Sequence, residues 1–460
     1  MHEALKAIVG PDGWTSDPAA LEPHLHEWRG TWQGRTPLML SPASTDEVAA
    51  LVRACAAERI AIVPQGGNTG LCGGAIPDRS NTQVLLSLRR LNRIRRVAAD
   101  NYSLVAEAGC VLADIQQAAA AAGRLFPLSL AAEGSCQIGG NLSTNAGGIN
   151  VLRYGTARDQ VLGLEVVLPD GRVIDGLREL RKDTAGYDLK QLFIGAEGTL
   201  GIITAAALRL YPRIARHGTA LMAVGGADEA VRLLADLRER FSDRLLAFEL
   251  MSARVVEMAT SHLDQVANPL AGTAPWFVLL ECAIDAGDAF ESGLAAVLEA
   301  GLASDAVVAK SEAERGALWR LRHGLSAAQK AEGASLKHDI SVPVDRIGEF
   351  LAAAGTVVEA ACPGARVVAF GHVGDGNLHY NVSQPAGAEP GAFLALRETV
   401  AECIYDVVER CGGSISAEHG IGVLKKDALA RYRGGVEIEL MRELKRLLDP
   451  LGIMNPGKVL

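Results

Sequence analysis

The eleven residues PQGGNTGLCGG (64–74) indicate most about how this chain folds. They follow the short apolar run AIV (61–63) and contain five glycines, so successive backbone N–H groups can point into one concavity without interference from Cβ atoms. A second segment, EGSCQIGGNLSTNAGG (133–148), repeats the pattern and adds Ser143, Thr144 and Asn145 as side-chain donors. Either segment alone would be read as an ordinary tight turn, whereas the pair favours one site that holds a pyrophosphate between two loops.

The sequence disfavours a nicotinamide enzyme. Neither glycine segment has the spacing G-x-G-x-x-G, and GAEGTLG (195–201) does not match it either.

Composition and charge bound the class of protein. A chain of 460 residues, with 49% hydrophobic and 22% charged residues, is expected to fold into two or three soluble domains. The net charge of −9 argues against a nucleic-acid binder. The basic run LRRLNRIRR (88–96) is more simply a solvated face, although docking to an acidic partner or a membrane surface stays open.

The location of the protein is predicted from what the sequence does not contain. The eight cysteines are scattered and form no C-x-x-C pair, which is typical of reduced thiols. The N-terminal residues have neither a basic nor an apolar signal region, and no apolar run reaches the roughly 18 residues of a membrane span. We therefore expect a cytoplasmic protein with no transmembrane segment.

Helical and strand-like patterns alternate along the chain and predict its domains. TDEVAALVRACAAER (45–59) has helical spacing, AIVP reads as a strand, and Asp170-Gly171 predicts a hairpin turn. After residue 213 longer helices alternate with isolated strands, which is typical of a mixed sheet covered by helices. We expect an α+β protein with domains at 1–213 and 214–389 and a helical C-terminal segment at 390–460.

The segment FGHVGDGNLHYNV (370–382) predicts a β-hairpin. If Asp375 and Gly376 form a two-residue turn, His372 pairs with His379, and Asn381 falls on the same face. Directly paired residues have Cβ atoms roughly 4.5–5.5 Å apart, which is close enough for two imidazoles to share a metal. The alternative is that the two histidines bind no metal and either face solvent or form hydrogen bonds within the core.

The segment GGSISAEHGIG (412–422) supplies two further candidates. Adjacent side chains on extended backbone point in opposite directions, so Glu418 can act as a third metal ligand while His419 faces a substrate as a base. Two histidines and a carboxylate leave coordination positions open, as catalytic sites do, and this donor set suits Zn, with Mn or Co as alternatives. Such a metal would lower the pKa of a substrate hydroxyl, and His419 would accept its proton.

The glycine segments, GAEGTLGIIT (195–204) and the NPGK terminus (455–458) together resemble the FAD-binding flavoproteins of the vanillyl-alcohol oxidase type over nearly the whole chain. The resemblance implies an N-terminal FAD-binding domain, with a C-terminus that returns to it. Because neither glycine segment contains a histidine, the FAD is expected to be non-covalent. The implied cofactor-binding residues are Pro64, Gly66, Gly67, Asn68, Thr69, Gly70, Gly134, Gly139, Gly140, Ser143, Thr144, Asn145, Gly148, Gly198, Ile203 and Asn455.

Within that family the chain most resembles the D-2-hydroxyglutarate dehydrogenases. The resemblance implies that Arg322, Ser326, Lys337, Asn381 and His419 act on the substrate and that His372, His379 and Glu418 bind the metal. Ser326 stands where a threonine is often found. Lys337 favours a dicarboxylate, because the D-lactate and glycolate dehydrogenases of the family usually lack it.

Several alternatives remain open at this point. The resemblance implies a small 2-hydroxy acid as the substrate, either D-2-hydroxyglutarate or D-lactate or glycolate. A flavin-free metallohydrolase is more distant, and a non-catalytic FAD-binding subunit is disfavoured because all candidate catalytic residues lie on this chain. The electron acceptor is an electron-transfer flavoprotein, a quinone or oxygen, and a homodimer is left open.

Overall fold

The computed structural model describes residues 2–270, 272–285 and 289–460. The chain folds into two compact units. The first consists of Met1–Gly148, Tyr154–Arg213 and Glu418–Leu460, and the second of Ile149–Arg153 and Ile214–Ala417. The helical segment that was expected from residue 390 is therefore divided, because α13 (Pro390–Leu394) and α14 (Arg397–Arg410) belong to the second unit and α15 (Lys426–Tyr432) and α16 (Val436–Leu448) to the first.

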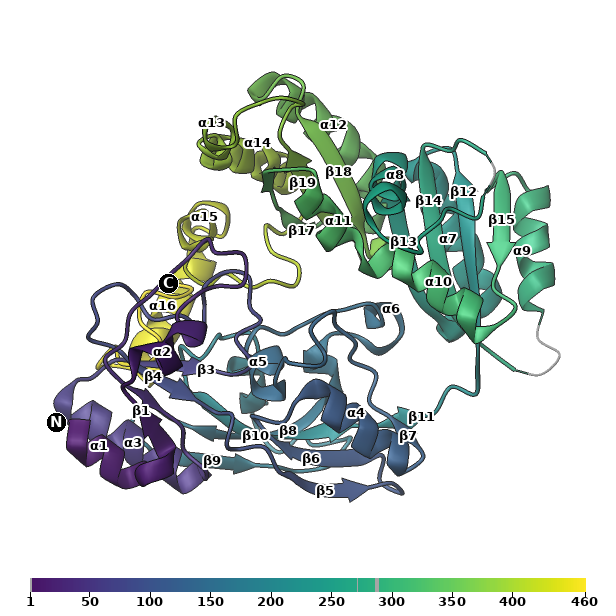
Figure 1. Ribbon diagram of the computed structural model, residues 1–460. Helices are drawn as coiled ribbons and strands as arrows, with labels where there is room; N and C mark the ends of the chain where they lie inside the picture. The colour runs from purple at the N-terminus through teal and green to yellow at the C-terminus, as the bar shows by residue number, and fades with distance from the viewer. Residues whose placement is uncertain (1, 271, 286–288) are drawn as a thin grey trace. The chain divides into compact units, whose positions relative to one another are not determined.

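The first unit contains a mainly parallel sheet and a five-stranded antiparallel sheet (Figure 1). The first sheet has the order β1 (Trp14–Thr15), β2 (Met39–Leu40), β4 (Val84–Ser87) and β3 (Ile62–Gln65). The second has the order β5 (Ile94–Ala98), β6 (Ser103–Glu107), β10 (Ile202–Arg209), β8 (Val161–Val167) and β9 (Val173–Gly176), and β7 (Arg124–Leu125) pairs with β11 (Tyr211–Pro212).

The helices of the first unit form where apolar residues recur at helical spacing. In α3 (Thr45–Glu58), the side chains of Val48, Leu51, Val52 and Cys55 are buried, and the Ser44 hydroxyl caps the N-terminus. The other helices are α1 (His2–Val9), α2 (Pro18–Leu21), α4 (Leu112–Ala121), α5 (Ile138–Ser143), α15 and α16, while α6 (Val151–Tyr154) is shared by the two units. The helix predicted at 45–59 and the turn at Asp170-Gly171, with Gly171 at φ 79°, are confirmed.

The C-terminal segment returns to the parallel sheet of the first unit. The N–H of Ile62 in β3 donates to the Ile453 carbonyl at 2.8 Å, and the N–H of Asn455 donates back to the Ile62 carbonyl at 2.8 Å. The yellow end of the chain accordingly lies beside the purple N-terminal strands in Figure 1. This pairing places the NPGK terminus next to the first glycine segment, which begins in the last two residues of β3.

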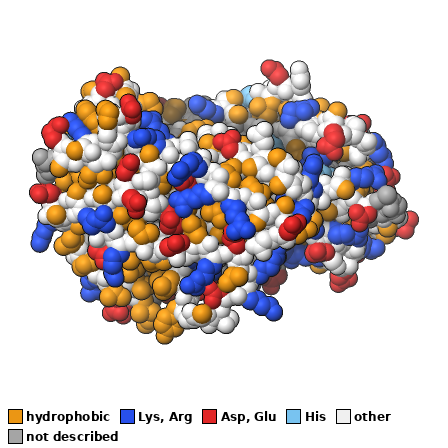
Figure 2. Space-filling view, turned by 90° about the horizontal axis from the view of Figure 1, so that it is seen from below, with side chains coloured by type: hydrophobic (Ala, Val, Ile, Leu, Met, Phe, Trp, Pro, Cys, Tyr) orange, Lys and Arg blue, Asp and Glu red, His pale blue; other side chains and the backbone are white. Residues whose placement is uncertain are grey.

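Three of the five arginines in the basic run 88–96 are paired with acidic side chains in the structure. Arg93 and Arg95 both form ion pairs with the buried Glu107, and Arg95 and Arg96 pair with Glu165 and Glu179. Figure 2 views the molecule from the side where β5 lies in Figure 1 and shows positive and negative side chains interspersed. The structure thus favours the solvated, ion-paired reading of this run. None of the helices in the described ranges is long and apolar enough to span a membrane.

The second unit is one antiparallel sheet covered by helices. Its strand order is β15 (Asp305–Val308), β12 (Arg216–Val224), β14 (Trp276–Ile284), β13 (Leu245–Ser252), β18 (Arg366–Gly371), β19 (Asn377–Ser383) and β16 (Ser335–Leu336), with β17 (Asp339–Ser341) also paired to β19. The helices are α7 (Ala227–Phe241), α8 (Ala253–His262), α9 (Phe290–Glu299), α10 (Glu312–His323), α11 (Leu325–Ala331), α12 (Ile347–Ala361), α13 and α14.

The two faces of this sheet have different covers. Met251, Val368 and Phe370 pack in one core cluster with residues of α8, α10 and α11. On the opposite face Phe350 of α12 packs edge-on against Tyr380, with ring centroids 5.3 Å apart. Because side chains alternate along each strand, the face under α8, α10 and α11 also receives the residues of β19 on either side of Tyr380, which are His379 and Asn381.

The predicted register of the hairpin is wrong by two residues. His379 pairs with Phe370, not with His372, and Asn381 pairs with Val368. The connection is longer than two residues because Val373–Asp375 form a 3-10 turn, closed by Gly376 at φ 86°. A shift of two residues preserves which faces of the two strands match, so His372 still points to the same side as His379 and Asn381.

Candidate active site

Both glycine segments line a single pocket in the first unit. The pocket and the solvent-filled space at its mouth together occupy about 840 Å³. Of the residues predicted to bind the cofactor, it is lined by Pro64, Gly66, Gly67, Asn68, Thr69, Gly70, Gly139, Gly140, Ser143, Thr144, Gly198 and Ile203. His419 lines it as well. The structure therefore brings the two segments together, with the predicted base at the same pocket.

The glycines of this pocket are needed for two different reasons. A Cβ at Gly67 would lie 2.1 Å from the Ser135 carbonyl oxygen, so this glycine permits the two segments to pack against each other. A Cβ at Gly70 or Gly140 would meet no atom within 4 Å, so it would project into open space. Glycines of the second kind leave backbone N–H groups accessible to a ligand.

Four predicted cofactor residues, Gly134, Asn145, Gly148 and Asn455, do not line the pocket. The Asn145 side chain accepts the Arg158 N–H at 3.0 Å. The Asn455 amide donates to the carbonyls of Gly74 and Glu197 at 2.9 and 2.7 Å. Asn145 and Asn455 thus brace the segments around the pocket.

The second glycine segment contains a helix that was not predicted. Residues 138–143 form α5, in which the Ser143 hydroxyl donates to the Gly139 carbonyl at 2.7 Å. Thr144, at the end of α5, donates likewise to the Gly140 carbonyl at 3.2 Å. Both hydroxyl protons are committed to the helix, so the backbone N–H groups and hydroxyl lone pairs are what these residues offer to a ligand.

Two polar residues at this pocket were missed by sequence reasoning. Gln137 lines the pocket, and its buried Oε1 has no hydrogen-bond partner among the described residues, as expected for a group that awaits a ligand. Glu197 is also buried and lines the pocket, and it accepts the N–H groups of Ile421 and Gly422 at 2.7 and 2.9 Å. Burial raises the pKa of Glu197, and these hydrogen bonds oppose that effect.

The glycine segments with open backbone N–H groups and the buried Gln137 oxygen that has no partner among the described residues together fit FAD.

The polar candidates of the second unit share one face of its sheet. The registers of β16 and β17 with β19 place Asp339 opposite His379 and, by continuation, Lys337 opposite Asn381. Phe370 is paired with His379 from the other side. Charged and amide side chains of β17, β19 and the residue between β16 and β17 therefore lie together, with the Phe370 ring of β18 beside His379.

Glu249 of β13 lies at the centre of this arrangement, although no motif in the sequence pointed to it. Leu250 pairs with Gly371, so continuing the register by one residue places Glu249 opposite His372. The carboxylate is fully buried and accepts hydrogen bonds from Arg322 Nε, at 2.6 Å, and from His372 Nδ1. Burial alone would raise the pKa of Glu249, but the charge of Arg322 and the hydrogen bonds from His372 and Arg322 hold it well below its usual range.

Arg322 is held in place on two sides. Its guanidinium lies over the Phe370 ring, 5.0 Å from the centroid, while Nε donates to Glu249. The residue is 8% exposed, and its two Nη atoms have no hydrogen-bond partner in the part of the chain that the structure describes. A buried guanidinium edge that has donors to spare is suited to a carboxylate.

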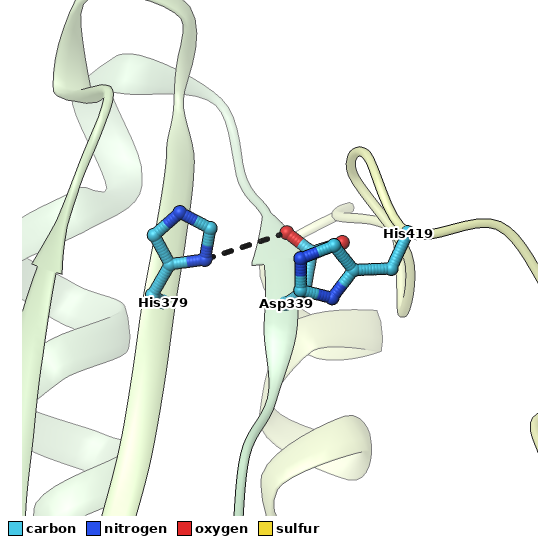
Figure 3. A group of neighbouring side chains, drawn as sticks. All are labelled: Asp339, His379 and His419. Carbon is cyan, nitrogen blue, oxygen red and sulfur yellow. Dashed lines mark ion pairs between the residues drawn. The ribbon is translucent and has the colours of Figure 1, made fainter. Parts of the chain in front are cut away.

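His372 and His379 can share a metal ion. Their rings stand edge to face with centroids 5.7 Å apart, and one nitrogen of each lies within 4.8 Å of the other. Asp339 Oδ1 lies 3.8 Å from His379 Nδ1, the contact that is dashed in Figure 3. Asn377 donates to the same oxygen at 3.0 Å. Nitrogen donors with a carboxylate behind them fit a divalent metal.

The remaining candidates differ in how firmly they are held. Asn381 is buried and donates to Gln329 of α11 at 2.9 Å, and Gln329 donates to Ser383 at 3.3 Å. Lys337 is half-buried between β16 and β17. Ser326 is exposed on α11, four residues after Arg322.

Glu418 and His419 are the first residues of the C-terminal segment of the first unit. Glu418 Oε1 accepts the N–H of Gly148 at 2.6 Å. The residue before it, Ala417, belongs to the second unit, and its N–H donates to Asp339 Oδ2 at 3.2 Å. Chain continuity therefore leaves Glu418 one peptide unit from a residue that is bound to Asp339.

Comparison with known proteins identifies the family. Two family models match: "FAD binding domain" over residues 37–176 and "FAD linked oxidases, C-terminal domain" over residues 215–459. The chain is 40% identical to the mitochondrial D-2-hydroxyglutarate dehydrogenase of Bos taurus, over 99% of this chain and 82% of that protein. It is also 40% identical to the enzyme of that name from Xanthomonas citri pv. viticola, over 96% and 93%. The chain belongs to the D-2-hydroxyglutarate dehydrogenase family of FAD-linked oxidoreductases.

Solved structures of the vanillyl-alcohol oxidase type share this fold. P-cresol methylhydroxylase with substrate bound matches with a TM-score of 0.79 at 18% identity, covering 99% of this chain and 95% of that one. The 4-ethylphenol oxidase from Gulosibacter chungangensis matches with a TM-score of 0.76, also at 18% identity, over 99% and 96%. The expected α+β fold and the FAD cofactor are confirmed. Membership of this family removes the flavin-free metallohydrolase from the alternatives.

Proposed function

We propose that this protein oxidises D-2-hydroxyglutarate to 2-oxoglutarate in a reaction that depends on FAD and a divalent metal. Relatives that carry this enzyme name are 35–40% identical to the chain over nearly its whole length. The observation that carries the proposal is the buried Arg322, whose Nη atoms have no partner among the described residues. From helix α10 it packs over the sheet face that also bears Lys337, Asn381 and the two histidines.

Each cation has a separate role in binding a dicarboxylate. The Nη edge of Arg322 binds one carboxylate through paired hydrogen bonds. Lys337, a compact charge on a flexible side chain, reaches the distal carboxylate with Ser326. Asn381, whose Nδ2 is held by Gln329, presents its amide to the reactive end. A monocarboxylate leaves Lys337 unused.

His372, His379 and Glu418 are the proposed metal ligands. The two imidazoles are close enough to share one ion, and Glu418 follows a residue that is anchored to Asp339, which contacts His379. Zn is the proposed ion, with Mn or Co as alternatives for the same donors. When bound, the ion would lower the pKa of the substrate hydroxyl.

His419 is proposed to accept the hydroxyl proton. It lines the flavin pocket of the first unit, and imidazole exchanges protons near neutral pH. The hydrogen on C2 leaves as a hydride with its electron pair, the hydroxyl proton passes to His419, and the remaining carbon and oxygen form the keto group. FAD supplies the two-electron acceptor. An electron-transfer flavoprotein or a quinone is the proposed acceptor of the electrons from the reduced flavin.

The decisive experiment is anaerobic bleaching of the bound flavin by a panel of 2-hydroxy acids. D-2-hydroxyglutarate should bleach the visible flavin absorbance fastest, ahead of D-lactate, glycolate and the L-enantiomer, with stoichiometric 2-oxoglutarate formed. Chelation should abolish bleaching without releasing flavin, and added Zn, Mn or Co should restore it. Faster bleaching by D-lactate would overturn the substrate, and full activity after exhaustive demetallation would overturn the role of the metal.

A further inference from the structure

Glu249 is a buried carboxylate that joins two functional side chains from different elements. It is 0% exposed and lies on β13, a central strand in which the residues next to it are apolar (LLAFELMS, residues 245–252). One oxygen accepts from Arg322 of α10, and the other accepts from His372 at the end of β18. These partners lie 73 and 123 residues away in sequence, so only the folded sheet brings the three groups together.

Stability by itself does not explain such a group. A buried carboxylate and its charged partners often make the folded state no more stable than apolar residues of the same volume would. The cost of removing the charged groups from water offsets the attraction between them. Each partner also has polar atoms that do not contact Glu249, namely the two Nη atoms of Arg322 and the second ring nitrogen of His372. What Glu249 fixes is the direction in which each partner offers its remaining nitrogens.

The geometry at Arg322 leaves one edge of the guanidinium for a ligand. Its Nε is occupied by Glu249, so a carboxylate cannot use the side edge made by Nε and an Nη atom. Binding must occur end-on, through both Nη atoms. The stacking of the guanidinium over Phe370 keeps its plane fixed.

The geometry at His372 selects a tautomer. A carboxylate only accepts hydrogen bonds, so Nδ1 must carry a hydrogen, and in the neutral ring Nε2 then keeps its lone pair. Metal-binding histidines are typically held by such a partner on the other nitrogen. Glu249 therefore offers Nε2, and not Nδ1, as the ligand atom.

We propose that Glu249 is a positioning residue that determines, through one buried carboxylate, both the edge of Arg322 offered to the substrate carboxylate and the nitrogen of His372 offered to the metal. This inference rests on the proposed function. It goes further by coupling the substrate anchor to the metal ligand, so that one substitution should weaken both.

The chain supplies a matched control in Glu281 of β14. This carboxylate is 5% exposed, lies on the adjacent strand and accepts hydrogen bonds from Arg315 and Trp319. Those two residues are on α10 as well, at positions seven and three before Arg322. Glu281 thus anchors the same helix without touching either functional side chain, so E281Q reports the cost of losing a buried carboxylate alone.

The test compares E249Q with E281Q in the FAD-loaded protein. Gln offers one acceptor and one NH₂ donor, so its NH₂ should donate to His372 Nδ1 and move the ring hydrogen to Nε2. We expect about a 10–100-fold loss of Zn²⁺ affinity, measured by competition with a chromophoric chelator. The KM for D-2-hydroxyglutarate should rise by about tenfold in the same variant. E281Q should lower the melting temperature and leave both values unchanged.

The ¹⁵N shifts of the His372 ring in metal-free protein give a readout that is independent of turnover. They should show the Nδ1–H form in the parent and the Nε2–H form in E249Q, with H372N used for assignment. Unchanged Zn²⁺ affinity and tautomer in E249Q would overturn the inference, as would an equal loss in E281Q. If the parent neither binds Zn²⁺ nor bleaches with substrate, the proposed function fails, and the tautomer still decides whether Glu249 orients His372.

A second variant covers failure of E249Q to fold. E249D keeps an acceptor-only carboxylate but is one methylene shorter, so it cannot reach both partners at once. Loss of the His372 contact should lower Zn²⁺ affinity, and loss of the Arg322 contact should raise the KM, so at least one of the two values should change. A folded E249D with parental Zn²⁺ affinity and KM would overturn the inference.

Discussion

The carboxylate of Glu197 accepts the backbone N–H of Ile421 at 2.7 Å and joins two parts of the first unit that are 224 residues apart in sequence. One oxygen binds Ile421, and the other binds Gly422 at 2.9 Å. Ile421 lies two residues after His419, and Glu197 itself lines the flavin pocket. The pair therefore fixes the segment that carries the proposed base relative to the cofactor site.

E197Q should loosen that segment. One backbone N–H would face the amide NH₂ group of Gln, and leaving a buried donor unpaired costs about 1–3 kcal/mol. We expect a decrease of that size in the free energy of unfolding, measured in urea, together with faster loss of FAD on dilution. E58Q, at the exposed end of α3, is the control. Parental stability and FAD retention in E197Q would contradict the bracing role.

Lys458 should make the unfolding free energy depend on pH. Burial lowers the pKa of this 3%-exposed lysine to about 8, although Asp78 and Glu197 oppose the shift. Above about pH 8 the unfolded chain therefore binds more protons than the folded chain, so stability should rise with pH. In apoprotein, the unfolding free energy of the parent minus that of K458M should become more positive between about pH 8 and 10. The increase should be at most about 1.4 kcal/mol per pH unit. If the unfolding free energy of the parent minus that of K458M stays constant or falls as the pH rises, the prediction is wrong.

Lys337 should decide between long and short substrates. Truncating one member of a desolvated charge pair costs roughly 2–5 kcal/mol, so K337A should lower kcat/KM for D-2-hydroxyglutarate by about thirtyfold or more. D-lactate does not reach this side chain, so its turnover should change by less than about tenfold. Equal losses on both substrates would place Lys337 at the reactive carboxylate and remove the preference for a dicarboxylate.

Gln329 should orient Asn381. Its Oε1 accepts from the Asn381 amide at 2.9 Å, so Q329L would let this amide turn. We expect the KM for D-2-hydroxyglutarate to rise several-fold to about a hundredfold, the equivalent of about 1–3 kcal/mol for a lost buried partner. The content of FAD should not change, because Gln329 belongs to the second unit. Steady-state kinetics and flavin absorbance measure the two effects, and loss of flavin with an unchanged KM would refute the assignment.

The FAD should be released intact by acid. Neither glycine segment contains a histidine that could form a covalent link. Acid-precipitated protein should therefore be colourless, with all flavin in the supernatant as FAD. Yellow, flavin-bearing precipitate would show a covalent bond from another residue.

Local sequence was sufficient to predict the two glycine segments of the flavin pocket because the residues that matter within each segment are close together in the chain. The glycines of 64–74 and 133–148 act through the backbone, and a run of glycines signals such behaviour directly. The helix α5 was missed because its sequence, IGGNLS, has low helical propensity. Packing overrides that propensity here, since a Cβ at Gly139 would lie 2.6 Å from the Ala108 Cβ.

The histidine pair shows a mixed outcome. Alternation of side chains correctly placed His379 and Asn381 on one face, because the period of two is a property of any strand. The partner of His379 was wrong, because register depends on the geometry of the turn, and a 3-10 turn replaced the two-residue turn that Asp375-Gly376 suggested.

The sequence by itself determined the cofactor class, the α+β architecture and most candidate residues, since these depend on local patterns and on resemblance to a family. Only the tertiary structure decided what holds those residues. Glu249 is a single acid in an apolar strand, and its partners are brought to it by the pairing of β13 with β18 and by the packing of α10. A carboxylate acts on whatever lies within about 3 Å of its oxygens, and for a buried strand residue only the folded chain sets that neighbourhood.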